Sequence, residues 1–207
     1  STTIVPARTT DQIEGLFRVA GGYVGVYNEG GNLASEFSDE YKYQVLHTAR
    51  TPPSAQLRGV GGYSRALAAC GDEVFGVAHD PAAVPGVLSL KRLHPSEQLI
   101  ERVRFPTAME FEGLEAPCRE GTMYFLGIPT NPEIAPPPQP MLLFKWNVVS
   151  GKLTTVPLTD ANGAPLLQSL DEKLLTRTDV GSLASETFYW FDGRGRVQST
   201  DVDSGAT

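Results

Sequence analysis

The residues best able to do chemistry are few and widely spaced in this chain. His79 is followed directly by Asp80, and a histidine beside a carboxylate is a candidate acid–base pair because its ring titrates near neutrality. Adjacent residues of a strand point to opposite faces, so these two side chains would not cooperate within a strand. Asp80 and Pro81 are also a common turn opening, which leaves His79 as a candidate on its own.

Metal-binding patterns are weak. His47 and His94 stand apart from His79 without ligand spacing, and we therefore expect no metal site and no cofactor. The segments that begin at Asp160 and Asp201 start like calcium loops, but they lack the further oxygen ligands and the final Glu of an EF-hand. Asp, Asn and Gly are also the residues that tight turns require, so we interpret both segments as turns.

The remaining chemistry is limited. The sequence contains no nucleophile elbow, phosphate-binding glycine loop or dinucleotide fingerprint. Its two cysteines, Cys70 and Cys118, are too few for an all-cysteine zinc site. They fit either one disulfide or two small buried side chains, and the sequence leaves both readings open.

Length and charge narrow the function classes. The chain has 207 residues, 41% of them hydrophobic, which predicts a single domain over residues 1–207. The formal net charge of −7 is spread along the chain and repels phosphate backbones, so we expect no nucleic-acid partner. With no apolar run of about 18 residues we expect no membrane partner either, and the compartment stays open between secreted and cytoplasmic.

Four similar hydrophobic segments indicate a repeat. Each is about six residues long, rich in β-branched and aromatic residues, and bounded by turn formers, which is a strand composition. They are Gly22 to Tyr27, Glu73 to Ala78, Met123 to Ile128 and Thr187 to Asp192. Taking Tyr23, Val74, Tyr124 and Tyr189 as equivalent gives two nearly equal intervals and a longer third one, which a polar insertion over Asp160–Pro165 explains.

Further strands are predicted around each segment. A first strand precedes it at Ile13–Val19, Tyr63–Ala69, Phe111–Ala116 and Leu174–Thr178, and the word Glu-Gly-Leu recurs at residues 14–16 and 112–114. A third strand follows at Asn32–Phe37, Gly86–Leu93, Pro140–Val148 and Arg196–Val202. A fourth follows in three units, at Tyr43–Arg50, Leu99–Phe105 and Lys152–Leu158. The chain is therefore predicted to be all-β.

Four strands repeated about every 50 residues resemble the blades of a β-propeller. The Asn147-Val-x-Ser-Gly turn and its counterpart at Asp201 are similar to the hairpin between the third and fourth strands in several propeller superfamilies. The resemblance covers most of the chain but matches no single family. It implies a four-bladed propeller, with a β-sandwich or a partial propeller as the alternatives.

The two ends of the chain suggest how such a ring closes. The fourth unit stops at the turn after Asp201, and the strand it lacks should resemble Thr154–Leu158 of unit three. Residues Ser1–Ala7 carry that composition, with one extra residue. We therefore expect the N-terminal strand to complete the last blade and to cover its open edge.

The resemblance also points to channel-lining residues, because the first strand of each propeller blade faces the central channel. Counting back nine residues from the equivalent positions reaches Glu14, Arg65 and Glu115, and His79 joins them as a candidate. The same charges fit a structural ion network at the axis. The Pro-rich segment 131–140 is either a docking element or an ordinary surface loop.

The favoured function is a ligand- or protein-binding module that presents loops on a rigid propeller. The alternative is an isomerase or cyclase acting on a small molecule at the channel mouth. A second alternative is a lectin that stacks sugars on strand aromatics, although most strand aromatics pack between blades. Trp146 and Trp190 are not one repeat apart, so they do not define equivalent sugar pockets. The expected partner is accordingly a small molecule, a sugar or another protein.

Overall fold

The protein is built from β-strands. The computed structural model describes residues 12–28, 41–46, 55–59, 63–79, 87–104, 109–112, 116–129, 140–167, 182–191 and 196–207. Within these ranges every regular element is a strand, and the strands form four antiparallel sheets. The prediction of an all-β chain is confirmed. None of the described segments is a helix of the length and apolar character needed to cross a membrane.

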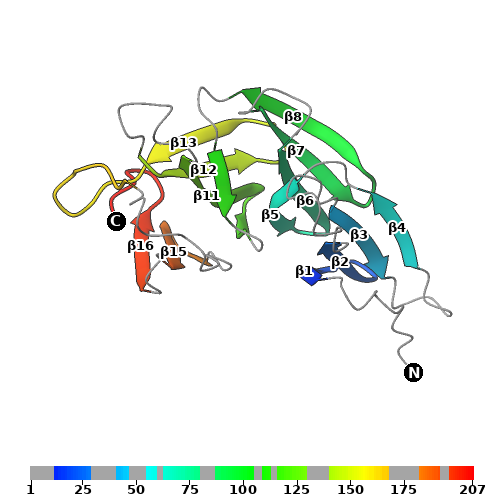
Figure 1. Ribbon diagram of the computed structural model, residues 1–207. Helices are drawn as coiled ribbons and strands as arrows, with labels where there is room; N and C mark the ends of the chain where they lie inside the picture. Colours follow the sequence, from blue (N-terminus) through cyan, green and yellow to red (C-terminus); the bar gives the residue numbers. More distant parts are fainter. Residues whose placement is uncertain are drawn as a thin grey trace.

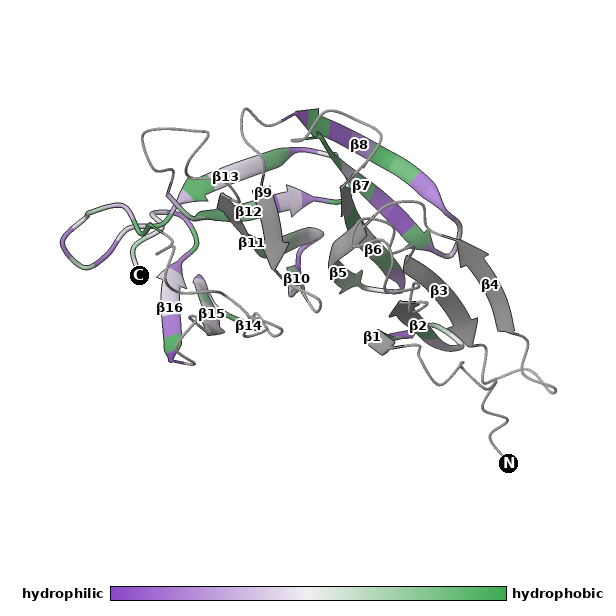
Figure 2. Ribbon diagram, viewed as in Figure 1, coloured by the Kyte–Doolittle hydropathy of each residue, from purple (hydrophilic) through white to green (hydrophobic). Residues whose placement is uncertain are grey.

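The first two sheets each contain four strands in chain order. Sheet one consists of β1 (Gln12–Val19), β2 (Gly22–Asn28), β3 (Tyr41–Leu46) and β4 (Ala55–Gly59). Sheet two consists of β5 (Tyr63–Cys70), β6 (Glu73–His79), β7 (Val87–His94) and β8 (Gln98–Arg104). β8 carries bands of hydrophilic and hydrophobic residues (Figure 2), and it is mostly exposed except for half-buried Ile100 and Val103.

The last two sheets follow the same order. Sheet three consists of β9 (Met109–Glu112), β10 (Cys118–Arg119), β11 (Thr122–Pro129), β12 (Leu142–Asn147) and β13 (Leu153–Pro157). β9 and β10 both pair with β11, so together they occupy the place of one first strand. Sheet four consists of β14 (Ser182–Ala184), β15 (Thr187–Phe191) and β16 (Val197–Asp201).

The four sheets follow one another along an open arc (Figure 1). β4, β8 and β13 lie on its convex side, while on the other side β1 contacts β5, and β5 contacts β9 and β10. Sheets one and four lie at opposite ends. The described sheets therefore form neither a two-sheet sandwich nor a closed ring of four. The pairing predicted for Ser1–Ala7 lies outside the described residues and stays a prediction.

Three apolar layers hold the sheets together, each made by facing side chains of two neighbours. Between sheets one and two lie Phe17, Val19, Val24, Leu67, Val74 and Leu93. Between sheets two and three lie Ala66, Ala68, Phe75, Val77, Leu88, Leu90, Ala116, Met123, Phe125, Phe144, Trp146 and Val148. Between sheets three and four lie Leu126, Met141, Leu143, Leu158, Phe188, Trp190 and Val202. Sheets two and three each pack against two neighbours, and alternate residues along one strand point to the two faces.

Sheets one and two share the register of their first hairpin. Val19 pairs with Gly22 across the first hairpin of sheet one. Cys70 pairs with Glu73 across the first hairpin of sheet two, so the two turns have the same length. Tyr23 and Val74 each follow the residue that leaves this turn, and their predicted equivalence is therefore confirmed.

The proposed equivalence is wrong by one residue in units three and four. The residues that follow the first hairpin turn there are Thr122 and Thr187, which makes Met123 and Phe188 the counterparts of Val74. Met123 and Phe188 are buried against the preceding sheet, whereas Tyr124 and Tyr189 lie on the opposite face. The equivalence of Tyr124 and Tyr189 with Tyr23 rests on matching aromatic residues, whereas the hairpin turn sets the register of the strands.

One predicted strand has the wrong place in its unit, and two others lie outside the described residues. The third strand of unit one is β3, which had been assigned as the fourth, and the fourth strand is β4 instead. The segment proposed as the third strand, Asn32–Phe37, lies outside the described residues. In unit four the first strand is β14, and the segment assigned to it, Leu174–Thr178, also lies outside them. The predicted order was set by apolar runs alone. In the structure, the pairing of β3 with β2 and of β14 with β15 sets the order of these strands.

Candidate functional site

The first strand of sheet one is interrupted at Glu14. Ile13 pairs with Tyr27 and Gly15 pairs with Val26, so Glu14 has no partner position across the hairpin. This is a β-bulge, in which one extra residue is left out of the ladder and the strand bends.

Sheet two carries the same bulge at Arg65. Ser64 pairs with Ala78 and Ala66 pairs with Val77, which leaves Arg65 as the extra residue at the position equivalent to Glu14. Bulges are frequent beside binding sites, where they re-aim a side chain. Because β1 contacts β5, the structure brings these two bulges onto neighbouring first strands, one with an acidic and one with a basic residue.

The first strand of sheet three is interrupted at nearly the same level. Glu112 pairs with Leu126, and Cys118 pairs with Met123. β9 ends at Glu112 and β10 begins at Cys118. The candidate Glu115 belongs to residues 113–115, which lie outside the described residues. Glu112, at the end of β9, was not among the candidates. It pairs with Leu126 as Gly15 pairs with Val26, so it lies one position away from the equivalent of the bulge residue Glu14 despite the shared Glu-Gly-Leu word.

His79 ends β6 and lies beside the second bulge. It pairs with Tyr63 on one side and with Leu88 on the other, and Tyr63 precedes Arg65 closely on β5. The backbone therefore places His79 and Arg65 at the same end of the β5–β6 hairpin. The connections after β2, β6 and β11 leave their sheets at the equivalent end, since the strand order is repeated.

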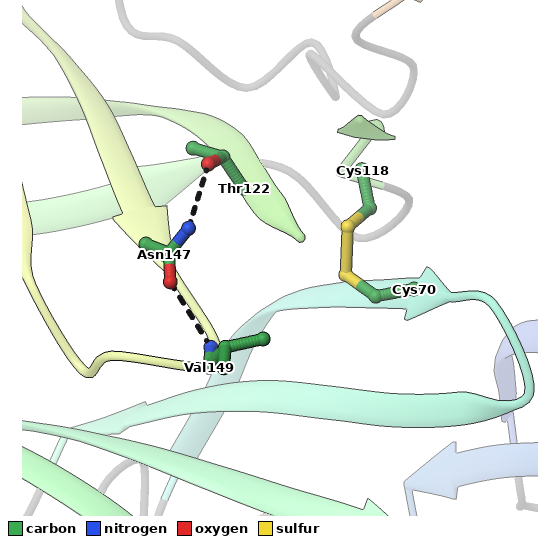
Figure 3. The surroundings of a disulfide bond; sticks show 5 residues. All are labelled: Cys70, Cys118, Thr122, Asn147 and Val149. Atoms are coloured by element: carbon green, nitrogen blue, oxygen red, sulfur yellow. Dashed lines mark hydrogen bonds between the residues drawn. A yellow bond between two sulfur atoms is a disulfide. The ribbon is translucent and has the colours of Figure 1, made fainter. Parts of the chain in front are cut away.

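A covalent link fixes two of these first strands together. Cys70 at the end of β5 and Cys118 in β10 form a disulfide between sheets two and three (Figure 3). In addition, the Ala116 N–H donates to the Leu67 carbonyl at 2.6 Å. Of the two readings left open by the sequence, the disulfide is the one observed.

The two tryptophans lie inside the protein. Trp146 is fully buried between sheets two and three, and Trp190 is buried against sheet three. Their indole N–H groups donate to the Gly151 carbonyl and the Thr200 hydroxyl, both at 2.9 Å. Neither ring is available to stack on a sugar, so these residues cannot serve the lectin alternative.

The two segments that resemble calcium loops are turns, as predicted. The Asp160 carboxylate accepts backbone N–H groups of Asn162 and Ala164 at 2.8 and 2.9 Å. The Ala164 bond is the main reason that the pKa of Asp160 lies below its ordinary value. Within the described ranges, His, Cys, Asp and Glu side chains do not gather in groups of three that could hold a metal ion.

No protein-family model matches this sequence, and no curated protein matches it significantly.

Proposed function

We propose that this chain is a binding module whose four sheets are blades of an open β-propeller, and that it holds a small polar ligand at the interrupted first strands. The blade assignment is supported by the repeated strand order, the shared register of sheets one and two, and the three apolar layers between successive sheets.

The single observation that carries the binding proposal is the pair of equivalent bulges at Glu14 and Arg65. A bulge costs ladder hydrogen bonds, so its repetition with opposite charges on neighbouring strands favours a role beyond folding. A carboxylate and a guanidinium on neighbouring strands suit a ligand that carries both an ammonium and a carboxylate group. We therefore expect a zwitterionic small molecule, such as an amino acid or a short peptide end.

The scaffold suits binding because it is held in place before a ligand arrives. The Cys70–Cys118 disulfide joins β5 to the first strand of sheet three, close to the break between β9 and β10. Preorganised positions lower the ordering cost of binding.

A thermal-shift screen tests the proposal, since a ligand that prefers the folded state raises the melting temperature. The panel contains zwitterionic amino acids, dicarboxylates, diamines and sugars. We expect the zwitterions to raise the melting temperature, and the rise to be lost in Glu14→Gln and in Arg65→Gln. Glu101→Gln and Arg102→Gln, exposed on the edge strand β8, are matched controls that should retain it.

Other outcomes would overturn the proposal. A shift given only by sugars would favour the lectin alternative, and no shift with any class would remove the small-ligand function. A zwitterion shift that persists in both bulge variants would place the site elsewhere. Turnover of a shifting ligand, lost in His79→Gln, would instead support the isomerase or cyclase alternative.

A further inference from the structure

The described outer side chains of the β1–β2 hairpin in sheet one are exposed and partly apolar. Leu16 and Tyr23 have 56% and 41% of their surface exposed, and Arg18 lies opposite Tyr23 across the β1–β2 hairpin. The alternate residues Phe17 and Val24 point the other way, into the layer against sheet two. Among the described side chains of the β1–β2 hairpin, those on one face are covered and Leu16, Arg18 and Tyr23 on the other, its free face, are exposed.

The equivalent positions in the following sheets are all covered by a preceding sheet. Leu67 and Val74, the counterparts of Leu16 and Tyr23 one repeat later, are fully buried against sheet one. Met123 in sheet three and Phe188 in sheet four are buried in the same way. Within the described residues, the position occupied by Tyr23 is thus a sheet-to-sheet contact in sheets two, three and four and is exposed in sheet one.

Sheet four has the complementary free face. Tyr189 on β15 and Val197 on β16 are 39% and 62% exposed, on the face opposite to Phe188 and Trp190. The residue equivalent to Tyr189 in sheet two is Phe75, which is buried against the following sheet. The exposed face of sheet four is therefore equivalent to the face with which sheets one to three each contact the next sheet along the chain.

We propose that the free face of sheet one binds the free face of sheet four of a second copy of this chain, head to tail. Each copy carries one face of each kind, and the contact would continue an interface that the chain already makes three times internally. The two faces differ, so the contact is heterologous and produces either a closed ring or an extending chain of copies. Apolar side chains grouped on one sheet face are typical of such contacts.

Sedimentation equilibrium of the intact, oxidised chain tests the proposal. We expect concentration-dependent association for the natural protein. We also expect at least about a tenfold weaker association for Leu16→Asp and for Val197→Asp, because each variant damages one face. Leu99→Asp, at an exposed apolar position on β8 away from both faces, is the matched control and should associate normally. Circular dichroism and thermal melting show that each variant is folded.

Mixing the two variants provides the decisive measurement. An equimolar mixture of Leu16→Asp and Val197→Asp contains one undamaged pair of faces, so dimers should reappear, and they should not grow further. A natural chain that is monomeric throughout would overturn the proposal, including the case in which both variants are monomeric but melt earlier because the faces cover each other within one chain. Association that neither variant weakens, or that mixing does not restore, would overturn it as well.

Discussion

Asn147 and Asp201 begin two turns of the same geometry, one after β12 and one after β16. In both, the side-chain Oδ1 atom accepts the next two available backbone N–H groups, at 3.2 and 2.8 Å. Each turn then reaches a glycine with positive φ, Gly151 at 70° and Gly205 at 76°. In sheet three the Asn147 side chain also donates to Thr122 (Figure 3). The turn predicted from the repeated sequence is confirmed in both places.

The acidic member of this pair should make stability pH-dependent. The Ser204 N–H, and next the Ser204 hydroxyl, hold the pKa of Asp201 below its ordinary value of 3.8. Its contribution is therefore fully present above the unfolded-state pKa and is lost as the pH falls through the lower folded-state pKa. We expect Asp201→Asn to reduce the loss of stability between pH 5 and pH 2, measured by guanidinium unfolding.

The reciprocal change, Asn147→Asp, is the matched test of that prediction. It places a carboxylate on the same set of donors in sheet three, so the variant should lose more stability than the natural chain over the same acid range. Equal acid sensitivity in all three proteins would show that the turn carboxylate does not contribute.

Substitutions at Gly205 and Gly163 should distinguish the cost of backbone strain from the cost of a steric clash. Both have positive φ, 76° and 77°, but a Cβ at Gly205 would collide with the Pro157 carbonyl oxygen, whereas nothing lies within 4 Å of one at Gly163. We expect Gly163→Ala to lower the free energy of unfolding by about 1 to 2 kcal/mol. Gly205→Ala should cost about 1 to 3 kcal/mol more, because the backbone must shift. Urea unfolding measures both, and equal losses would contradict the steric contribution.

The sequence predicts many of the individual strands well because local patterns determine them. Most strands of units two to four and the Asn147 and Asp201 turns follow from alternating apolar residues and turn formers. The identity of Glu14 and Arg65 as equivalent positions also follows from counting along the repeat. That both are bulge residues does not, because a bulge depends on the pairing of two strands and not on one strand's composition.

The relation between sheets is harder to predict. Side-chain alternation shows that a strand has two covered faces, but it does not show which sheet covers them or whether the last sheet meets the first. The matching composition of Ser1–Ala7 and Thr154–Leu158 suggested a closed ring, whereas the described sheets form an open arc. The disulfide could likewise not be predicted without the positions of β5 and β10, because two cysteines in a sequence fit either a disulfide or two free, buried side chains.

The Cys70–Cys118 disulfide should stabilise the arc substantially. It closes a loop with a sequence separation of 48 residues, for which restriction of the unfolded chain gives about 4 kcal/mol. We expect reductant to lower the urea midpoint of the natural chain. The Cys70→Ser, Cys118→Ser double variant should match the reduced protein and ignore reductant. A natural chain whose midpoint is unchanged by full reduction would contradict the prediction.

Thr200 accepts a hydrogen bond from the buried indole of Trp190, and its substitution tests how much this bond contributes to stability. Its hydroxyl is fully buried, accepts the Trp190 N–H at 2.9 Å and lies 2.8 Å from the Thr207 hydroxyl. Thr200→Val keeps the shape but leaves the indole donor without this acceptor, so we expect a loss of about 1 to 3 kcal/mol in urea unfolding. Thr154→Val, where the exposed hydroxyl makes only a 3.4 Å bond to the Lys145 carbonyl, is the control and should change stability by less than about 0.5 kcal/mol. A Thr200→Val variant as stable as the control would mean that Trp190 finds another acceptor, and tryptophan fluorescence would then report a moved ring.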